Sequence, residues 1–399
     1  MNRFIALAVL VVGSSFAHAE DWSQFRGQNG TGISTEAGLP VKWSKSEGVR
    51  WSMPLPARGV SSPVVHGGKV YITCRSGALD NRLHVLAYDG KTGAKLWHRQ
   101  LAATGGTNCH PMTCMAAPTP VADDTGVYAM FATGDLAAYD TDGTLRWYRS
   151  LVGDYPSITN QVGMASSPVL ADGKLIVPMD NAGESFIAAL DRKTGKNLWK
   201  INRERQINWV TPLVRTHDGK TEVIMSGRGV VTAYYGETGE KLWSQKDTGP
   251  SDIASATFQE GVLYSPGRGG TTALKAENGT FKELWKSPKL NGGMSSPLVY
   301  KNIVYAATGA GVVNAADAVT GTPLWDERFK GKASASPLAG DGKVYIFNEK
   351  GLTTVLKAAD KAEILAENDL GEETLGTPAI SGGAIFIRTD KTLFCIGAK

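Results

Sequence analysis

The sequence predicts an all-β fold, an eight-bladed β-propeller of four-stranded antiparallel blades. The first observation is a recurring phrase: a small residue and proline, then Gly-Lys-Val-Tyr, then Ala-x-Asp-x-x-Thr-Gly-x-x-Leu-Trp. It returns about every 40 to 50 residues, a period typical of propeller blades. The second observation is composition: 399 residues include 47 glycines and 18 prolines, too many for a helical protein.

Each repeat opens at a proline or, once, an alanine. The eight starts are Pro63, Pro118, Pro168, Pro212, Ala256, Pro297, Pro337 and Pro378. Short runs of β-branched and aromatic residues, such as 70–73 and 344–347, follow between glycine-rich turns and are typical of strands. The sequence therefore predicts eight blades over residues 49–399.

The last repeat contains residues for three strands, at 379–380, 384–388 and 393–396. The segment 49–53 precedes the first full repeat and carries Trp51. We expect this segment to supply the fourth strand of the last blade, because a ring closed by both chain ends removes exposed sheet edges.

The recurring turn has a structural explanation. Asp89, for example, lies four residues before Gly93, so its carboxylate can bond the turn backbone while glycine takes a positive φ. A tryptophan follows four residues later, where a large ring can fill the gap to the next blade. We interpret the following as structural repeat residues: Asp89, Gly93, Trp97, Asp140, Trp147, Asp191, Gly195, Trp199, Gly239, Trp243, Trp285, Asp317, Gly321 and Trp325.

The first 19 residues have the pattern of a cleavable secretory leader. Arg3 precedes the apolar run 4–12, and Ala17 and Ala19 stand at −3 and −1 before Glu20. The run is too short for a bilayer span, and no cysteine stands at the cleavage point for lipid attachment. We therefore expect a monomer in the periplasm or outside the cell, with residues 20–48 as a segment before the propeller.

Charge excludes one class of partner. Lys and Arg number 42 and Asp and Glu 38, a net charge of +4 spread along the chain. Because no basic stripe or patch stands out, we expect no nucleic-acid partner.

The repeats at 87–97, 189–199 and 315–325 resemble the pyrroloquinoline-quinone (PQQ) type of propeller repeat over the whole mature chain. Trp22-x-Gln-Phe-Arg-Gly-x-x-Gly-x-Gly, ending at Gly32, is similar to the start of a secreted bacterial group related to the assembly lipoprotein BamB. Quinoprotein alcohol dehydrogenases of this type carry adjacent cysteines, and BamB proteins carry a lipid-modified cysteine; neither is found here.

The resemblance thus implies a scaffold that binds a protein, peptide or glycan, with no catalytic residue and no cofactor. The alternative is a divergent quinoprotein oxidoreductase that uses PQQ and calcium.

Strand connectivity assigns the long insertions 75–82, 99–116, 151–165 and 179–185 to one rim, which we call the long-loop face; the Asp-x-x-Thr-Gly turns lie on the opposite rim. Long loops on a rigid scaffold are the usual place for binding. The candidate ligand-binding residues are Arg75, His110, Asn160, Gln161, Asp180, Asn181, Glu184, Asn208, Trp209, Arg228 and Arg268. Arg228 and Arg268 could direct positive charge into the channel and attract anions.

Two small groups suggest more specific chemistry. Asp180, Asn181 and Glu184 could offer oxygen ligands to calcium; the alternative is a simple polar turn. Cys109 and Cys114 could form a local disulfide in an oxidising compartment, the alternative being a metal site with His110.

Overall fold

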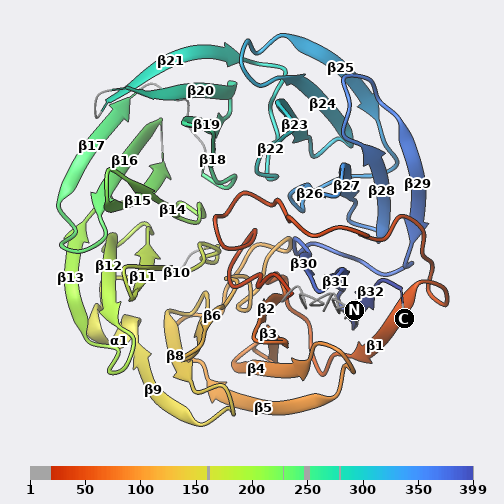
Figure 1. Cartoon of the computed structure of the whole chain (residues 1–399). Helices are drawn as coiled ribbons and strands as arrows, with labels where there is room; N and C mark the ends of the chain where they lie inside the picture. The colour runs from red at the N-terminus through yellow and green to blue at the C-terminus, as the bar shows by residue number, and fades with distance from the viewer. Residues whose placement is uncertain (1–18, 160–161, 228, 247–251, 278–279, 399) are drawn as a thin grey trace, which may run out of the picture.

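The computed structural model describes residues 19–159, 162–227, 229–246, 252–277 and 280–398. These residues form eight four-stranded antiparallel sheets, placed as blades round a central channel (Figure 1). The prediction of an eight-bladed propeller is confirmed. In the part of the chain described here, no helix is long and apolar enough to cross a bilayer.

We number the blades in chain order. Blade 1 contains β2 (Val64–His66), β3 (Lys69–Ser76), β4 (Arg82–Asp89) and β5 (Lys95–Ala102), and blade 2 contains β6 (Val121–Asp123), β7 (Gly126–Met130), β8 (Asp135–Tyr139) and β9 (Leu145–Ser150). Blade 3 contains β10 (Val169–Ala171), β11 (Lys174–Met179), β12 (Phe186–Asp191) and β13 (Asn197–Asn202). Blade 4 contains β14 (Leu213–His217), β15 (Lys220–Gly227), β16 (Val230–Tyr235) and β17 (Lys241–Lys246). The single-turn helix α1 (Leu151–Asp154) follows β9.

Blades 5 to 7 repeat the same order. Blade 5 contains β18 (Thr257–Gln259), β19 (Val262–Gly267), β20 (Gly270–Glu277) and β21 (Thr280–Ser287). Blade 6 contains β22 (Leu298–Tyr300), β23 (Ile303–Ala307), β24 (Val312–Asp317) and β25 (Pro323–Arg328). Blade 7 contains β26 (Leu338–Gly340), β27 (Lys343–Phe347), β28 (Leu352–Lys357) and β29 (Ile364–Asp369).

Blade 8 closes the ring with both ends of the chain. It contains β30 (Ala379–Ser381), β31 (Ala384–Arg388), β32 (Thr392–Ile396) and, as its outer strand, β1 (Val49–Pro54). In the β1–β32 pair Trp51 lies opposite Cys395 and Met53 opposite Leu393. The expected closure by the segment 49–53 is confirmed.

One repeat start is wrong by two residues. The inner strand β6 follows Pro120, just as β2 follows Pro63, so Pro118 does not open the second blade. The reason is the sequence Ala-Pro-Thr-Pro, which offers two prolines at the end of a long insertion.

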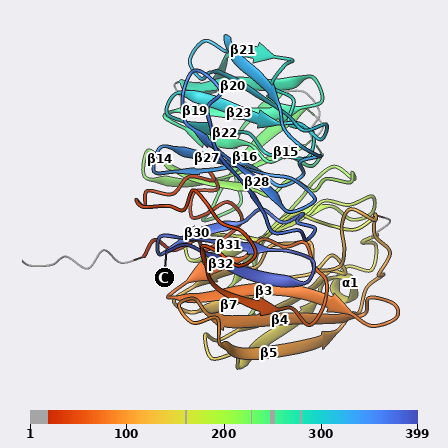
Figure 2. The ribbon, with the colours of Figure 1, turned by 90° about the vertical axis from the view of Figure 1, so that its right-hand side faces the viewer.

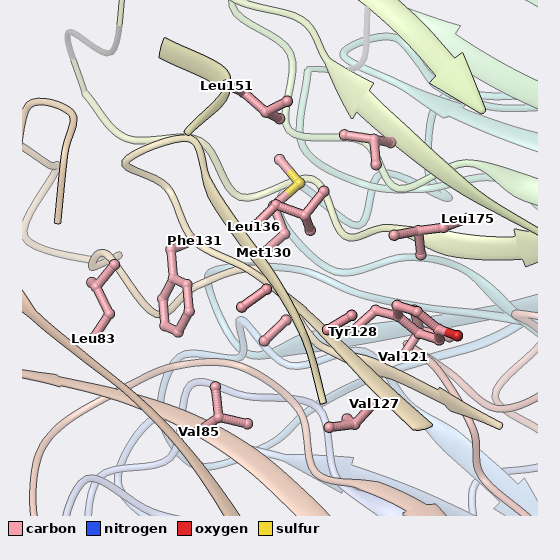
Figure 3. Close-up of a cluster of buried hydrophobic side chains, with 14 of the residues drawn as sticks. Leu83, Val85, Val121, Val127, Tyr128, Met130, Phe131, Leu136, Leu151 and Leu175 are labelled. Carbon is pink, nitrogen blue, oxygen red and sulfur yellow. The ribbon is translucent and has the colours of Figure 1, made fainter. Parts of the chain in front are cut away.

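Apolar side chains between blades form the core. Figure 3 shows Leu83 and Val85 of β4 near Val127 and Phe131 of blade 2, with Leu175 of β11 beyond them. All five are fully buried. A blade buries its faces only against its neighbours, so the ring is stable as a unit.

Each tryptophan of the repeat joins two blades. The Trp147 indole lies over Gly195 of the next blade, where φ is +70° and an added Cβ would stand 2.7 Å from the ring. Trp147 Nε1 donates to the Arg192 carbonyl at 2.9 Å. The same contact joins Trp97 to Gly143, Trp199 to Gly239 and Trp285 to Gly321. The turn glycine is therefore required for its φ and for the close approach of the ring.

The turn aspartates behave as expected in blades 1, 3 and 6. Asp191 Oδ1 accepts the backbone N–H of Thr194 at 2.8 Å and its hydroxyl at 2.8 Å. These bonds to Thr194 lower the pKa of Asp191. Blade 2 differs, because its turn is shorter and Asp140 pairs with Arg146.

Candidate functional site

The segment before β1 enters the central channel. Trp22 pairs with Val65 of β2 through two backbone hydrogen bonds, of 2.7 and 2.9 Å, and Ile33 bridges to Ala339 of β26. Figure 1 shows the segment crossing the middle of the ring, and Figure 2 places it toward the face opposite α1. We call residues 22–33 the plug, because they fill the end of the channel away from the long-loop face.

A buried arginine holds the plug between blades. Arg26 is 1 % exposed, and its Nη2 donates to Thr257 Oγ1 at 2.8 Å and to the Pro297 carbonyl at 2.6 Å. Burial lowers the pKa of Arg26 to about 9. Gly27 has a φ of +80° and lies against the Trp22 indole. The motif from Trp22 to Gly32, which carries the resemblance to a known family, thus forms the plug.

Above the plug lies a cavity of about 400 Å³ that opens at the long-loop face. Phe25 of the plug lines it, and each of the eight blade-to-blade connections contributes two residues spaced two apart. The outer tier, which we call the collar, consists of Val60, Ala117, Ala165, Trp209, Ile253, Met294, Ser334 and Leu375. Side chains two residues apart in extended chain point the same way, so one repeated pattern produces a complete ring.

The inner tier is a ring of eight hydroxyl side chains, one from each blade. Its members are Ser62, Thr119, Ser167, Thr211, Ser255, Ser296, Ser336 and Thr377. In seven successive pairs the backbone N–H of one member donates to the hydroxyl of the next at 3.0–3.1 Å. These bonds join the blades and fix seven of the eight hydroxyl oxygens in a circle.

Charge is nearly missing from this cavity. Among its described lining residues none is Asp, Glu, Lys or Arg, and His110 at the mouth is the one histidine. Two arginines of the surrounding face are paired with acids, Arg75 with Asp80 and Arg268 with Asp252. Because Arg268 is paired with an acid, it does not support the expected ring of positive charge in the channel. Arg228, the other arginine expected in that ring, lies outside the described residues.

The structure brings two of the sequence-predicted ligand residues into the cavity, His110 and Trp209. Trp209 Nε1 donates to the Gly163 carbonyl at 2.8 Å, which holds the indole in the collar. Arg75 lies near the end of β3 and Arg268 in the turn between β19 and β20, each with its acidic partner. Asn160 and Gln161, like Arg228, fall outside the described residues.

The expected calcium ligands have protein partners instead. Asp180 is buried, and its carboxylate accepts hydrogen bonds from Arg203 Nε at 2.8 Å and from Asn208 Nδ2 at 2.9 Å. Asn181 Oδ1 accepts the Gly183 N–H at 2.7 Å, and Glu184 binds Lys200 at 2.7 Å. Within the described ranges, no group of three His, Cys, Asp or Glu side chains could hold a metal ion. The polar turn is the reading that fits these contacts.

The four cysteines are thiols in this structure. Cys109 and Cys114 are not bridged, and the Cys109 Sγ lies 3.8 Å from the Thr113 carbonyl. Burial raises the pKa of Cys114, which keeps it protonated. The disulfide expected from sequence stays a prediction.

Sequence reasoning missed the hydroxyl ring and Phe25. The signal was present, because the residue before each strand-opening proline or alanine is Ser or Thr in all eight repeats. In the sequence these positions mark the starts of the repeats, and nothing in the pattern shows that they face the channel. Phe25 lies inside the recognised motif, whose place in the channel the sequence does not specify.

A closed ring of eight such sheets, tied by repeat tryptophans and turn glycines, defines a propeller of the PQQ-like class. The chain belongs to the BamB family. The family profile described as "Outer membrane protein assembly factor BamB" matches residues 27–182, 183–282, 227–336, 268–362 and 309–396.

Individual relatives point in two directions. The chain is 23 % identical over 347 residues to BamB from Moranella endobia, covering 82 % of each protein. It is 24 % identical over 260 residues to a polyvinylalcohol dehydrogenase from Sphingopyxis sp., covering 54 % of this chain and 38 % of the relative. The chain thus spans less than two fifths of that dehydrogenase.

The fold also matches a solved structure, the quinohemoprotein alcohol dehydrogenase from Comamonas testosteroni. The TM-score is 0.72 at 15 % identity, covering 95 % of this chain and 81 % of that one. Similarity at this identity shows the fold alone.

Proposed function

We propose that this chain is a non-catalytic binding propeller of the cell envelope, which holds a protein, peptide or glycan on its long-loop face. The observation that carries the proposal is the convergence of all eight blade-to-blade connections on one cavity at that face. A closed scaffold with its loops so gathered is suited to binding. The name of the BamB relatives, outer membrane protein assembly factor, supports a scaffold role.

The test is capture of partners from envelope extract, followed by mass spectrometry. Ile253→Glu places a charge in the exposed collar, and Ala94→Glu places one at an exposed position on the opposite rim as a control. We expect wild type and Ala94→Glu to retain the same partner and Ile253→Glu to lose it. A partner lost with Ala94→Glu and kept with Ile253→Glu would move the working surface to the other face.

We infer that the mature protein begins at Glu20, in the periplasm or outside the cell. The Glu20 backbone nitrogen donates to Glu36 Oε1 at 2.8 Å, and Glu36 also accepts the N–H groups of Gly382 and Gly383. Cleavage before Glu20 would place a cationic amine at this carboxylate. The intact mass of protein recovered from the envelope should correspond to residues 20–399; a mass that includes the leader contradicts this inference.

The cavity's chemistry does not fit a quinone cofactor. PQQ carries three carboxylates, and the described lining residues offer no cation to pair with them. Binding would therefore remove water from these carboxylates and provide no opposite charge in its place. The carboxylates expected to hold calcium are engaged by Arg203 and Lys200. We infer that neither PQQ nor calcium is required.

Calcium and quinone titrations test this inference. Asp180→Asn should lower the free energy of unfolding by about 3 kcal/mol with or without calcium, because it leaves Arg203 buried without its counter-charge. Asp154→Asn, at an exposed partner of Arg149, is the control and should change little. Saturable quinone binding in calorimetry, with a calcium requirement that Asp180→Ala and Glu184→Ala remove, would establish the dehydrogenase alternative.

A further inference from the structure

We propose that the channel cavity binds an uncharged saccharide unit, with the sugar ring inside the collar and its hydroxyls on the hydroxyl ring. The inference rests on the proposed binding function and names the ligand class and the site. It begins from the two tiers of the cavity, which differ in chemistry although both come from the same repeated connection.

The inner tier favours ligand groups that both donate and accept hydrogen bonds. Each of the eight hydroxyls has lone pairs and a proton, and the N–H bonds between blades hold their oxygens in place. A purely apolar occupant would remove water from these hydroxyls without replacing its hydrogen bonds. A sugar presents hydroxyls of the same dual character.

The outer tier favours a ligand with an apolar face. Seven of its eight members are apolar, among them Trp209, Ile253 and Met294. Phe25 adds a second aromatic ring at the lower end. The faces of a pyranose ring carry C–H groups that pack against such side chains, while its edge remains polar.

Charge decides between neutral and ionic ligands. The described lining residues include no carboxylate, ammonium or guanidinium group. Two buried guanidiniums, those of Arg26 and Arg388, lie outside the lining and donate to the Pro297 and Ser61 carbonyls. A charged ligand would be desolvated without a contacting counter-ion, which is unfavourable.

Size and access agree with this ligand class. The cavity of about 400 Å³ falls in the usual range for small-molecule sites and can take one or two sugar rings. It opens where His110 and Ile253 are exposed, and the plug fills the other end of the channel. A glycan would therefore enter by one end from the long-loop face.

The experiment is saturation-transfer NMR on the full mature chain with maltose, cellobiose and diacetylchitobiose as neutral probes and methyl glucuronide as the anionic probe. We expect at least one neutral disaccharide to bind and the glucuronide to bind at least tenfold more weakly. Ala165→Phe, which fills the collar, should reduce disaccharide affinity at least tenfold. Ala94→Phe makes the same change at an exposed site on the opposite rim and should leave it unchanged.

Trp209→Ala is a second collar variant, for the case in which Ala165→Phe does not fold. It removes the collar indole and enlarges the collar, so it should also weaken disaccharide binding. Binding unaffected by both collar variants, stronger binding of the glucuronide, or no binding by any neutral probe would overturn the inference. If no sugar binds while the long-loop face still captures its envelope partner, the saccharide site is wrong and the proposed function stands.

Discussion

Two histidines in blade 1 form a pair, of which His84 is buried and His98 is half-buried. His84 is 4 % exposed, its Nδ1 lies 2.8 Å from His98 Nε2, and its Nε2 lies 2.7 Å from Ser76 Oγ. Burial, with added repulsion from His98 and Arg82, lowers the pKa of His84 to about 4. The folded protein therefore keeps His84 neutral where the unfolded chain begins to bind a proton.

Stability should fall in acid because of this pair. Between pH 6.5 and 4 the unfolded chain binds the proton more readily, so the free energy of unfolding decreases as pH falls through this window, by at most about 3 kcal/mol. Urea unfolding at several pH values should give a shallower pH dependence for His84→Gln than for wild type. His217→Gln, at a 40 % exposed side chain, is the control; equal slopes in wild type and His84→Gln would contradict the assignment.

The residue scale also shows what a local sequence pattern does not contain. Asp180 and Glu184 lie at a spacing open to calcium binding, yet their roles depend on Arg203 and Lys200, which come from a later part of the chain. A carboxylate's partner is set by tertiary contacts, which the local pattern does not contain. His110 and Trp209 were found because their loops could be assigned to a face.

At the scale of elements, the junction between outer strand and neighbouring turn holds adjacent blades together. Sequence periodicity was sufficient to place the strands, the turn aspartates and the positive φ of the turn glycines. It did not show that each glycine receives the indole of the preceding blade, because that contact joins residues 36 to 48 positions apart.

Two matched glycines separate backbone strain from this contact. Gly195 and Gly219 have φ values of +70° and +72°, but an added Cβ meets the Trp147 indole at 2.7 Å in the first and no atom within 4 Å in the second. Gly219→Ala should lower the free energy of unfolding by about 1 kcal/mol, the cost of the left-handed conformation alone. Gly195→Ala should lower it by about 3 kcal/mol. Equal losses in denaturant unfolding would show that the indole contact contributes little.

On the scale of the whole molecule, the N-terminal segment makes two separate contributions. Strand β1 completes blade 8, which the unpaired last repeat made predictable. Residues 22–33 fill one end of the channel, which sequence could not indicate because their partners lie in β2, β18 and β26. Because the plug occupies that end of the channel, the entrance to the cavity is at the long-loop face.

The central claim is therefore that the plug is part of the folded ring. Native-state hydrogen exchange tests it most directly through the amides of Trp22, in the plug, and Ser34, directly after it, which donate to the carbonyls of Val65 and Ala339 at 2.7 and 2.8 Å. We expect both amides to exchange only on global unfolding, at the rate of the slowest amides of the buried strands β3 and β27, which do not bond to the plug. Exchange of Trp22 and Ser34 as fast as that of exposed turn amides, with the inner strands still protected, would contradict the claim and open the channel at both ends.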